Sequence, residues 1–250
     1  ILANEIITAL GVSTKQDILK APTSNADAYE YYLKGKHKFN NRETLADTKI
    51  ARELLQKAIE IDDEIISAKL LLAETYRIYS DEDRAMEIYE KALNQSEKLG
   101  DKKNSAIALR KIGSIYSYPF NNYDKALDYY TRSLEISELI DDKSLISWAL
   151  NNIGSIYRDQ NNEIKAFDYY TRAIKIAEEI GDKGTIAYIS GFIGNYYESI
   201  GNFDTALDYY TSALEISEEL DNKRKMGQSL KSIGNLFYDK GDNDQAKDYY

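Results

Sequence analysis

The sequence predicts an all-α protein, an α-solenoid in which antiparallel helix pairs stack one after another. Three observations lead to this prediction. A sequence pattern recurs about every 40 residues. Apolar residues within each copy recur at helical steps of three and four. The chain has 22 tyrosines but only 2 prolines and 13 glycines, and few breakers with many bulky aromatic residues favour long, packed helices.

The repeat is clearest in the segments expected to form the first helix of each pair. ALRKIGSIY (108–116), ALNNIGSIY (149–157), YISGFIGNYY (188–197) and SLKSIGNLFY (229–238) share a glycine column, made of Gly113, Gly154, Gly194 and Gly234. A second column follows in NYDKALDYYTRSLEIS (122–137), NEIKAFDYYTRAIKIA (162–177), NFDTALDYYTSALEIS (202–217) and NDQAKDYY (243–250).

Each copy predicts two helices joined by a short turn. In one copy the helices are expected over 143–159 and 163–180, and Asn162 in the turn between them can cap the second helix. Gly100 and Gly181 suit the left-handed residue that follows a helix end. The acids at the start of the next copies suit the N-cap and the positive end of the helix dipole; they are Asp101, Asp142 and Asp182.

The small residues predict where the two helices of a pair approach each other. The glycine column would supply the gap on the first helix, and an alanine column would supply it on the second, made of Ala126, Ala166, Ala206 and Ala246. A glycine inside a helix costs about 0.5–1 kcal/mol relative to alanine, so its recurrence implies a packing role. We expect Gly154→Leu to destabilise the fold by several kcal/mol through overpacking.

These columns resemble the tetratricopeptide repeat (TPR), and the resemblance covers 64–250. The family pattern is filled in one copy by Leu150, Ile153, Gly154, Tyr157, Ala166, Tyr170 and Ala173. The resemblance implies a right-handed α-solenoid, the TPR superhelix. The family's closing proline is missing, because Glu97, Glu138, Glu178 and Glu218 stand in its place. Without that breaker the second helix can continue, which accounts for the long period. This form is similar to the repeats of kinesin light chains, LGN/Pins adaptors and many bacterial signalling proteins.

The start of the chain departs from the repeat. Residues 23–63 look like a degenerate copy, and 1–22 are expected to form a helical lead-in from an upstream domain. This stretch resembles the junction between a TolB-like domain and a TPR array in bacterial adenylate/guanylate cyclases and transcription regulators. The remaining boundaries predict copies at 64–101, 102–141, 142–181 and 182–221, with a truncated copy at 222–250. We expect the chain to be a segment of a longer protein.

First helices are expected to line the concave face of such a stack. We select positions three before, one after, four after and six before each glycine. The residues expected to form a binding groove are Arg110, Ser114, Trp148, Asn151, Ser155, Arg158, Tyr188, Asn195, Lys231 and Asn235. All the positions selected in this way, including Glu198 and Asp239 four after their glycines, carry three cations and two acids. This is a near-neutral lining in a chain of net charge −10. The alternative is that they are ordinary solvated positions.

Individual residues of the groove and of the aromatic pairs allow a structural or a functional interpretation. Lys231 and Asn235 resemble the opening pair of the carboxylate clamp in chaperone-binding TPRs, where a cation and an amide hold a peptide's terminal carboxylate. Trp148 is either core packing between copies or an apolar anchor for a peptide. In each Tyr-Tyr pair, such as Tyr169-Tyr170, the second ring is expected in the core and the first half exposed. The single histidine, His37, is expected to be a surface or satisfied residue.

The sequence also excludes several kinds of chemistry. Cysteine is absent and histidine occurs once, which excludes thiolate chemistry and a His-rich metal site. GDKGT (181–185) has the wrong order for a phosphate-binding loop, and DKGDNDQAKDYY (239–250) lacks the glycine and final glutamate of a calcium loop. No apolar run approaches the roughly 18 residues of a membrane span. We therefore expect no cofactor, no metal and no catalysis in this segment.

The favoured interpretation is a protein–protein interaction scaffold, the regulatory region of a bacterial multidomain signalling protein. Its partner is expected to be a peptide or protein domain, not a nucleic acid, since nucleic-acid binding needs clustered positive charge. The alternative is a structural role, in which homodimerisation or end-to-end packing positions a neighbouring domain. A cytoplasmic location is expected, although residues 1–22 carry no readable targeting signal.

Overall fold

The computed structural model describes residues 23–250, and the predicted lead-in at 1–22 lies outside the described residues. Every regular element between residues 23 and 250 is a helix, which confirms the predicted all-α, helical-repeat class. The chain divides into two compact units, Ile1–Phe120 and Asn121–Tyr250. The division falls inside the predicted copy 102–141, between its two helices.

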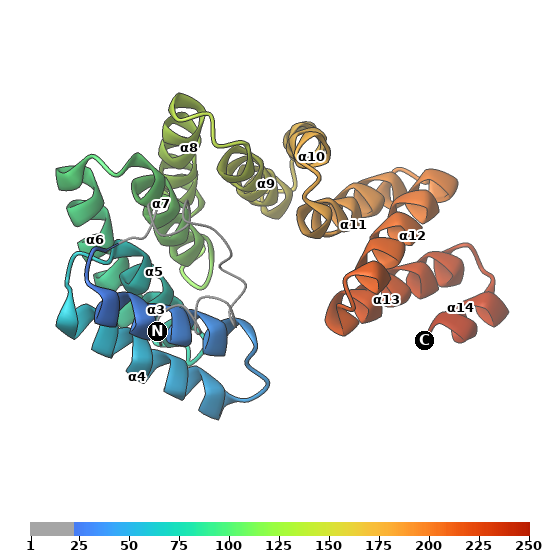
Figure 1. The fold of residues 1–250 in the computed structure, drawn as a ribbon. Coiled ribbons are helices and arrows are strands. Elements are labelled where there is room, and N and C mark those ends of the chain that lie inside the picture. Colours follow the sequence, from blue (N-terminus) through green and yellow to red (C-terminus); the bar gives the residue numbers. More distant parts are fainter. Residues whose placement is uncertain (1–22) are drawn as a thin grey trace. The chain divides into compact units, whose positions relative to one another are not determined.

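The helices follow one another as antiparallel neighbours within each unit (Figure 1). The first unit contains α3 (Ala26–Asn40), α4 (Leu45–Ile61), α5 (Ile66–Arg77), α6 (Glu82–Leu99) and α7 (Lys102–Ser117). The second unit contains α8 (Tyr123–Leu139), α9 (Lys143–Asp159), α10 (Glu163–Glu179), α11 (Lys183–Ser199), α12 (Phe203–Glu219), α13 (Lys223–Asp239) and α14 (Asn243–Tyr249).

The predicted helix starts are confirmed by side-chain caps. Asp142 accepts a hydrogen bond from the backbone N–H of Leu145 at 3.1 Å, and Asn162 accepts one from Lys165 at 3.2 Å. Every helix from α6 to α14 begins in this way, after an Asp or Asn whose side chain accepts a backbone N–H. These caps satisfy donors that the helix itself cannot pair.

The predicted left-handed helix ends are confirmed too. Gly100 has a φ of 69° and Gly181 a φ of 67°. Asp141 and Asp221 occupy the same place in their copies with φ values of 51° and 47°. An L-residue is strained in this conformation whereas glycine is not, so the copies differ in backbone strain at an equivalent position.

The packing partner of the glycine column differs from the prediction. A Cβ atom on Gly154 would lie 2.9 Å from Cε1 of Tyr170, and one on Gly194 would lie 2.5 Å from Cε1 of Tyr210. The gap therefore accommodates a tyrosine ring of the second helix and is not matched to the alanine column. Ala166 and Ala206 are buried as well, but the atoms nearest to the missing Cβ atoms belong to the tyrosine rings, which leave no room for a side chain there.

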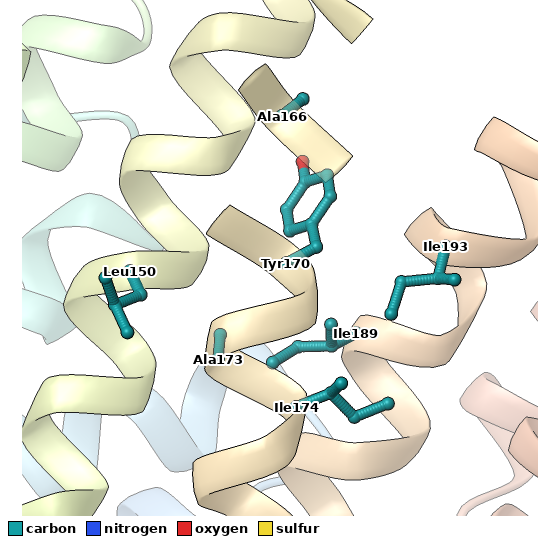
Figure 2. Close-up of a cluster of buried hydrophobic side chains, with 7 residues drawn as sticks. All are labelled: Leu150, Ala166, Tyr170, Ala173, Ile174, Ile189 and Ile193. Atoms are coloured by element: carbon teal, nitrogen blue, oxygen red, sulfur yellow. The ribbon is translucent and has the colours of Figure 1, made fainter. Parts of the chain in front are cut away.

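Apolar residues from three successive helices form a shared core in the second unit (Figure 2). Its buried members come from α9, α10 and α11; they are Leu150, Ala166, Tyr170, Ala173, Ile174, Ile189 and Ile193. In this unit α10 and α12 thus each pack against the first helix of their own copy and the first helix of the next. This arrangement makes one continuous core out of pairs that could not bury their apolar faces alone.

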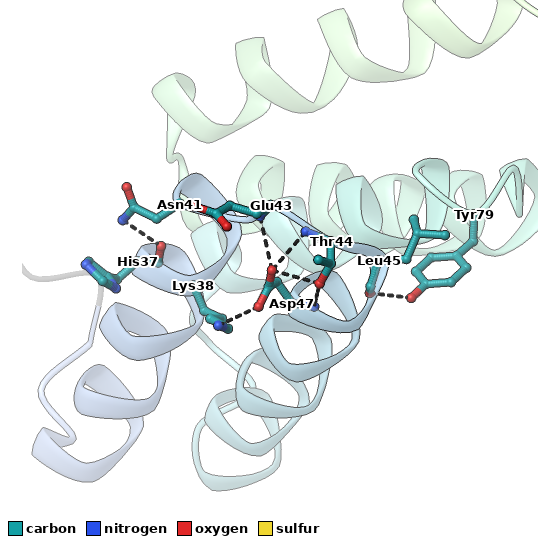
Figure 3. Close-up of polar contacts among 8 residues, drawn as sticks. All are labelled: His37, Lys38, Asn41, Glu43, Thr44, Leu45, Asp47 and Tyr79. Carbon is teal, nitrogen blue, oxygen red and sulfur yellow. Dashed lines mark hydrogen bonds and ion pairs between the residues drawn. The ribbon is translucent and has the colours of Figure 1, made fainter. Parts of the chain in front are cut away.

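The degenerate copy follows the same plan with different residues. A Cβ on Gly35 would lie 2.8 Å from Cγ of Leu55, so leucine takes the place of the tyrosine ring. The turn between α3 and α4 is held by polar contacts around Asp47, which accepts from Thr44 and pairs with Lys38 at 2.5 Å (Figure 3). The Lys38 hydrogen bond is the main reason that the pKa of Asp47 lies well below its usual value. His37 is exposed, as predicted.

Candidate binding groove

A cavity of about 570 Å³ opens in the second unit among α11, α12 and α13. Its chemistry is set by three residues of α11 and three of α13, namely Tyr188, Phe192, Asn195, Arg224, Lys225 and Lys231. Since α11 and α13 are the first helices of adjacent copies, the cavity lies where the sequence predicts a groove between first helices.

Four of the predicted groove residues line this cavity: Tyr188, Asn195, Lys231 and Asn235. They represent the positions six before, three before and one after the glycine. The position four after the glycine does not contribute, because neither Glu198 nor Asp239 is among the lining residues.

The residue directly after the glycine has a structural role in its own copy. The Tyr210 hydroxyl donates to Oδ1 of Asn195 at 2.6 Å, and the Tyr250 hydroxyl donates to Oδ1 of Asn235 at 2.7 Å. In the preceding copy the Tyr170 hydroxyl donates to Oγ of Ser155 at 3.2 Å. Burial is the largest cause of the raised pKa of Tyr170, which reaches about 12, so its hydroxyl stays protonated as a donor.

These contacts leave donor capacity on the amides. An asparagine side chain has an acceptor oxygen and an NH₂ group with two donors. Asn195 and Asn235 use the oxygen towards tyrosine, and within residues 23–250 neither Nδ2 atom donates a hydrogen bond. Both side chains are exposed. The tyrosine hydroxyl thus fixes the orientation of each amide group, while the NH₂ donors stay available to a ligand.

An aromatic cluster extends from α9 to α11. The Trp148 ring lies 5.7 Å from that of Tyr188, and the Tyr188 ring meets the edge of Phe192 at 5.1 Å. Phe192 also stacks on Tyr170 at 5.0 Å. Trp148 is half-buried in this cluster. It therefore packs between adjacent copies and still presents part of its ring to solvent.

The other predicted groove residues of α9 are either buried or in contact with other side chains of the protein. Asn151 is only 1% exposed, and its Oδ1 atom is buried without a hydrogen-bond partner. Arg158 pairs with Asp159 at 2.8 Å and lies over the Phe192 ring at 4.9 Å. None of Asn151, Ser155 and Arg158 is among the residues that line the cavity.

Arg110 and Ser114 lie on α7 and thus belong to the first unit. Ser114 accepts a hydrogen bond from Nη1 of Arg77 at 3.0 Å, and its own hydroxyl donates to the backbone carbonyl of Lys111 at 2.8 Å. Its hydroxyl is therefore part of a polar network within α5 and α7.

Sequence reasoning missed Arg224, Lys225 and Phe192. Arg224 lies ten residues before Gly234, and at 100° per residue that position falls on the same helix face as those three and six before it. Extending the position count by one turn would have found it. Lys225 lies over the Tyr188 ring at 4.1 Å from its centroid, a cation–π contact that spacing alone does not reveal.

The charge of the cavity is entirely positive. Arg224, Lys225 and Lys231 are its charged lining residues, with no Asp or Glu among them. Burial lowers the pKa of Lys225 below its ordinary value, and the positive charge of Arg224 lowers it further. The predicted near-neutral groove is thus more cationic at this cavity than the selected positions suggested.

Within the part of the chain that the structure describes, no His, Asp, Glu or Cys cluster could hold a metal ion. A search of the same residues finds no helix with the length and apolarity that crossing a bilayer requires.

Comparison with known proteins identifies the repeat. A tetratricopeptide repeat model matches residues 64–139, 120–179 and 184–250. No curated protein sequence matches the chain significantly.

Solved structures share the fold at low sequence identity. BtubC from P. vanneervenii matches with a TM-score of 0.66 and 19% identity, over 82% of this chain and 86% of that one. A STAND signal-transduction ATPase with a tetratricopeptide repeat sensor, from Pyrococcus horikoshii, matches with a TM-score of 0.71 and 20% identity, over 88% of this chain and 35% of that one.

A Rap protein in complex with competence and sporulation factor matches with a TM-score of 0.71 and 16% identity, over 91% of this chain and 74% of that one. Identities this low establish a common fold and leave the ligand open. The family model covers well over half of the sequence, and the chain belongs to the tetratricopeptide repeat family.

Proposed function

We propose that this chain is a non-catalytic protein-interaction scaffold that binds a peptide or a partner domain in the groove formed by the first helices of its second unit. The observation that carries the proposal is the cavity of about 570 Å³ between α11 and α13. It combines aromatic surface with oriented amide donors, which is the chemistry expected of a peptide-binding groove.

The structural relatives support a signalling context. One is a Rap protein solved with competence and sporulation factor, and another carries its repeats as the sensor of a STAND ATPase. By analogy, we propose that this chain is the ligand-binding region of a bacterial signalling protein, and that it transmits occupancy of the groove to an output domain.

Gly191 offers a direct way to block the groove. It lines the cavity, and a Cβ atom there would meet nothing within 4 Å. A tyrosine at this position can therefore fill the cavity without overlapping the backbone. We expect Gly191→Tyr to abolish binding of ligands selected on a peptide array, while its thermal unfolding midpoint stays close to that of the wild type.

Gln160→Tyr is the matched control. Gln160 is an exposed residue at the end of α9, outside the cavity, and its replacement adds the same side chain. It should bind every selected peptide as the wild type does. Peptides that bind the Gly191→Tyr variant with unchanged affinity would remove the groove from the proposal.

Self-association is the second candidate function. Apolar residues that follow or end three successive second helices are exposed: Leu139 at 68%, Ile180 at 40% and Leu220 at 49%. Light scattering of the full chain separates the two candidates. A dimer that dissociates in Leu139→Ser/Leu220→Ser supports self-association, whereas a monomer that binds peptides supports the groove.

A further inference from the structure

The cavity concentrates positive charge in a chain that is otherwise acidic. The formal net charge of the protein is −10, yet the charged side chains lining the cavity are three cations. Such a reversal needs a reason, because like charges held close together repel and destabilise the fold. Burial is the largest cause that lowers the pKa of Lys225 below its ordinary value, and repulsion from the charge of Arg224 lowers it further.

Other lysines of the second unit are neutralised by acids from neighbouring helices. Lys143 pairs with Glu179 at 2.8 Å, Lys183 pairs with Glu219, and Lys240 pairs with Asp204 at 3.3 Å. In contrast, Arg224, Lys225 and Lys231 form no ion pair with any residue that the structure describes. The fold thus supplies acids for three lysines elsewhere in the unit, while the charges of Arg224, Lys225 and Lys231 stay available to a ligand's negative charge.

The spacing of the cations favours several carboxylates over one compact anion. Arg224 and Lys231 are seven residues apart on α13, which is about 10 Å along the helix axis. An extended peptide advances about 3.3–3.6 Å per residue, so acidic side chains two or three residues apart can reach both ends of this row. The Tyr188 and Phe192 rings line the same cavity and provide an apolar surface beside the cations.

We propose that this cavity binds an acidic peptide segment, whose carboxylates pair with Arg224, Lys225 and Lys231 while an adjacent aromatic or apolar side chain packs on Tyr188 and Phe192. This inference rests on the proposed groove function and specifies its ligand. The free NH₂ donors of Asn195 and Asn235 can then bond the peptide backbone or further carboxylate oxygens.

The test measures fluorescence anisotropy with a short fluorescein-labelled peptide in which Asp and Glu residues flank one Phe. The Asn/Gln counterpart of this peptide is the uncharged probe. We expect the acidic peptide to bind, the uncharged peptide to bind at least about tenfold more weakly, and added salt to weaken the acidic peptide selectively.

The key variant is Arg224→Gln/Lys231→Gln, which should weaken binding of the acidic peptide about tenfold or more. The matched control is Lys223→Gln/Lys175→Gln, which removes the same net charge from two exposed lysines outside the cavity. Lys223 adjoins Arg224 in the chain, so the control also keeps the local charge change similar. Equal weakening by both variants would overturn the proposal, because it would reflect only net charge.

Three further outcomes decide between this inference, a different ligand and a failure of the groove function. If the peptides bind wild type equally with and without acids, and Gly191→Tyr abolishes both, the groove function holds and the acidic specificity is wrong. If a phosphoserine peptide binds and the carboxylate peptide does not, the acidic-peptide proposal is overturned in favour of a phosphopeptide. If binding of the acidic peptide is unaffected by Gly191→Tyr, the peptide does not bind in this cavity and the proposed groove function is wrong.

Discussion

The two units use the same position of the repeat in different ways. In the first unit the buried Tyr89 hydroxyl donates to Glu74, the residue that follows Ala73, and Ala73 lies 40 residues before Gly113 at the same position of the repeat. In the second unit the Tyr170 hydroxyl donates to Ser155, which follows Gly154, and the Tyr210 hydroxyl lies within hydrogen-bond distance of both Asn195, which follows Gly194, and Glu198. The tyrosine is equivalent in both units, and the difference lies in the residue that directly follows the small one, which is a charged glutamate in the first unit and a neutral serine or asparagine in the second.

This difference decides how the nearby cations are used. In the first unit Lys111 pairs with Glu74 at 2.7 Å, and Arg77 lies 3.9 Å from the same carboxylate. In the second unit Arg224, Lys225 and Lys231 on α13 form no ion pair with any of the residues 23–250. One repeat scaffold thus encloses an internally neutralised ion network in one region and presents uncompensated positive charge to a groove in the other.

The largest expected effect comes from the packing of glycine against tyrosine in the second unit. Its disruption should lower the free energy of unfolding more than any polar substitution in the first unit does. Gly194→Leu places side-chain atoms where the Tyr210 ring lies, since even a Cβ would be 2.5 Å from Cε1. We expect a loss of about 3 kcal/mol in the free energy of unfolding, measured by urea denaturation.

Gly227→Ala is the control for that substitution. Gly227 lies inside α13, and a Cβ there meets nothing within 4 Å, so alanine should stabilise the helix by about 0.5–1 kcal/mol. A near-wild-type stability of Gly194→Leu would show that the tyrosine ring does not require the glycine.

The ion network of the first unit gives an intermediate effect. Glu74→Gln leaves Lys111 half-buried without its carboxylate partner and should cost about 2 kcal/mol at pH 7, measured by urea denaturation. Glu74→Gln should barely change the affinity of the groove for a peptide, because the substitution lies in the other unit. A loss of peptide binding comparable to that of the groove variants would contradict the separation of roles.

The same pair predicts a pH dependence. Burial raises the pKa of Glu74, but the charge and hydrogen bond of Lys111 outweigh it, so the pKa lies below its ordinary value of 4.5. A carboxyl with a lowered folded-state pKa contributes its full stability above the unfolded pKa and loses it as pH falls through the folded pKa. The stability difference between wild type and Glu74→Gln should therefore shrink as pH falls below about 4.5. A constant difference down to strongly acidic pH would contradict this role.

The helix ends give the smallest effect. Asp221 has a φ of 47° where Gly181, one copy earlier, has a φ of 67°. Asp221→Gly should raise the free energy of unfolding by up to about 1 kcal/mol, and Gly181→Ala should lower it by about 1 kcal/mol. Thermal unfolding of both variants checks the opposite signs, and two shifts of the same sign would refute the account of the turn.

The sequence was sufficient for the parts of the fold that periodicity and local chemistry determine. The caps at Asp142 and Asn162, the left-handed Gly181 and the buried Tyr170 all follow from spacing and residue type. Helix periodicity also placed Tyr188 and Lys231 at the cavity, because it fixes which residues share a helix face.

The rest depends on side-chain direction and on contacts between distant residues. Periodicity does not say that the Tyr210 ring, rather than an alanine, fills the space over Gly194. It does not say that the side chain of Asn151 is buried while that of Asn195 is exposed. Long cationic side chains such as Arg224 reach a cavity from outside the positions that a short pattern selects.

A charge-swap binding measurement tests the central claim most directly. Lys225→Glu/Lys231→Glu reverses two of the three charges that line the cavity. By fluorescence anisotropy, this variant should lose the Asp/Glu peptide and gain affinity for a peptide in which Lys replaces each acid, while its circular dichroism spectrum stays helical. Retention of the acidic peptide by the folded variant, with no gain for the Lys peptide, would contradict the claim that the groove selects its ligand by charge.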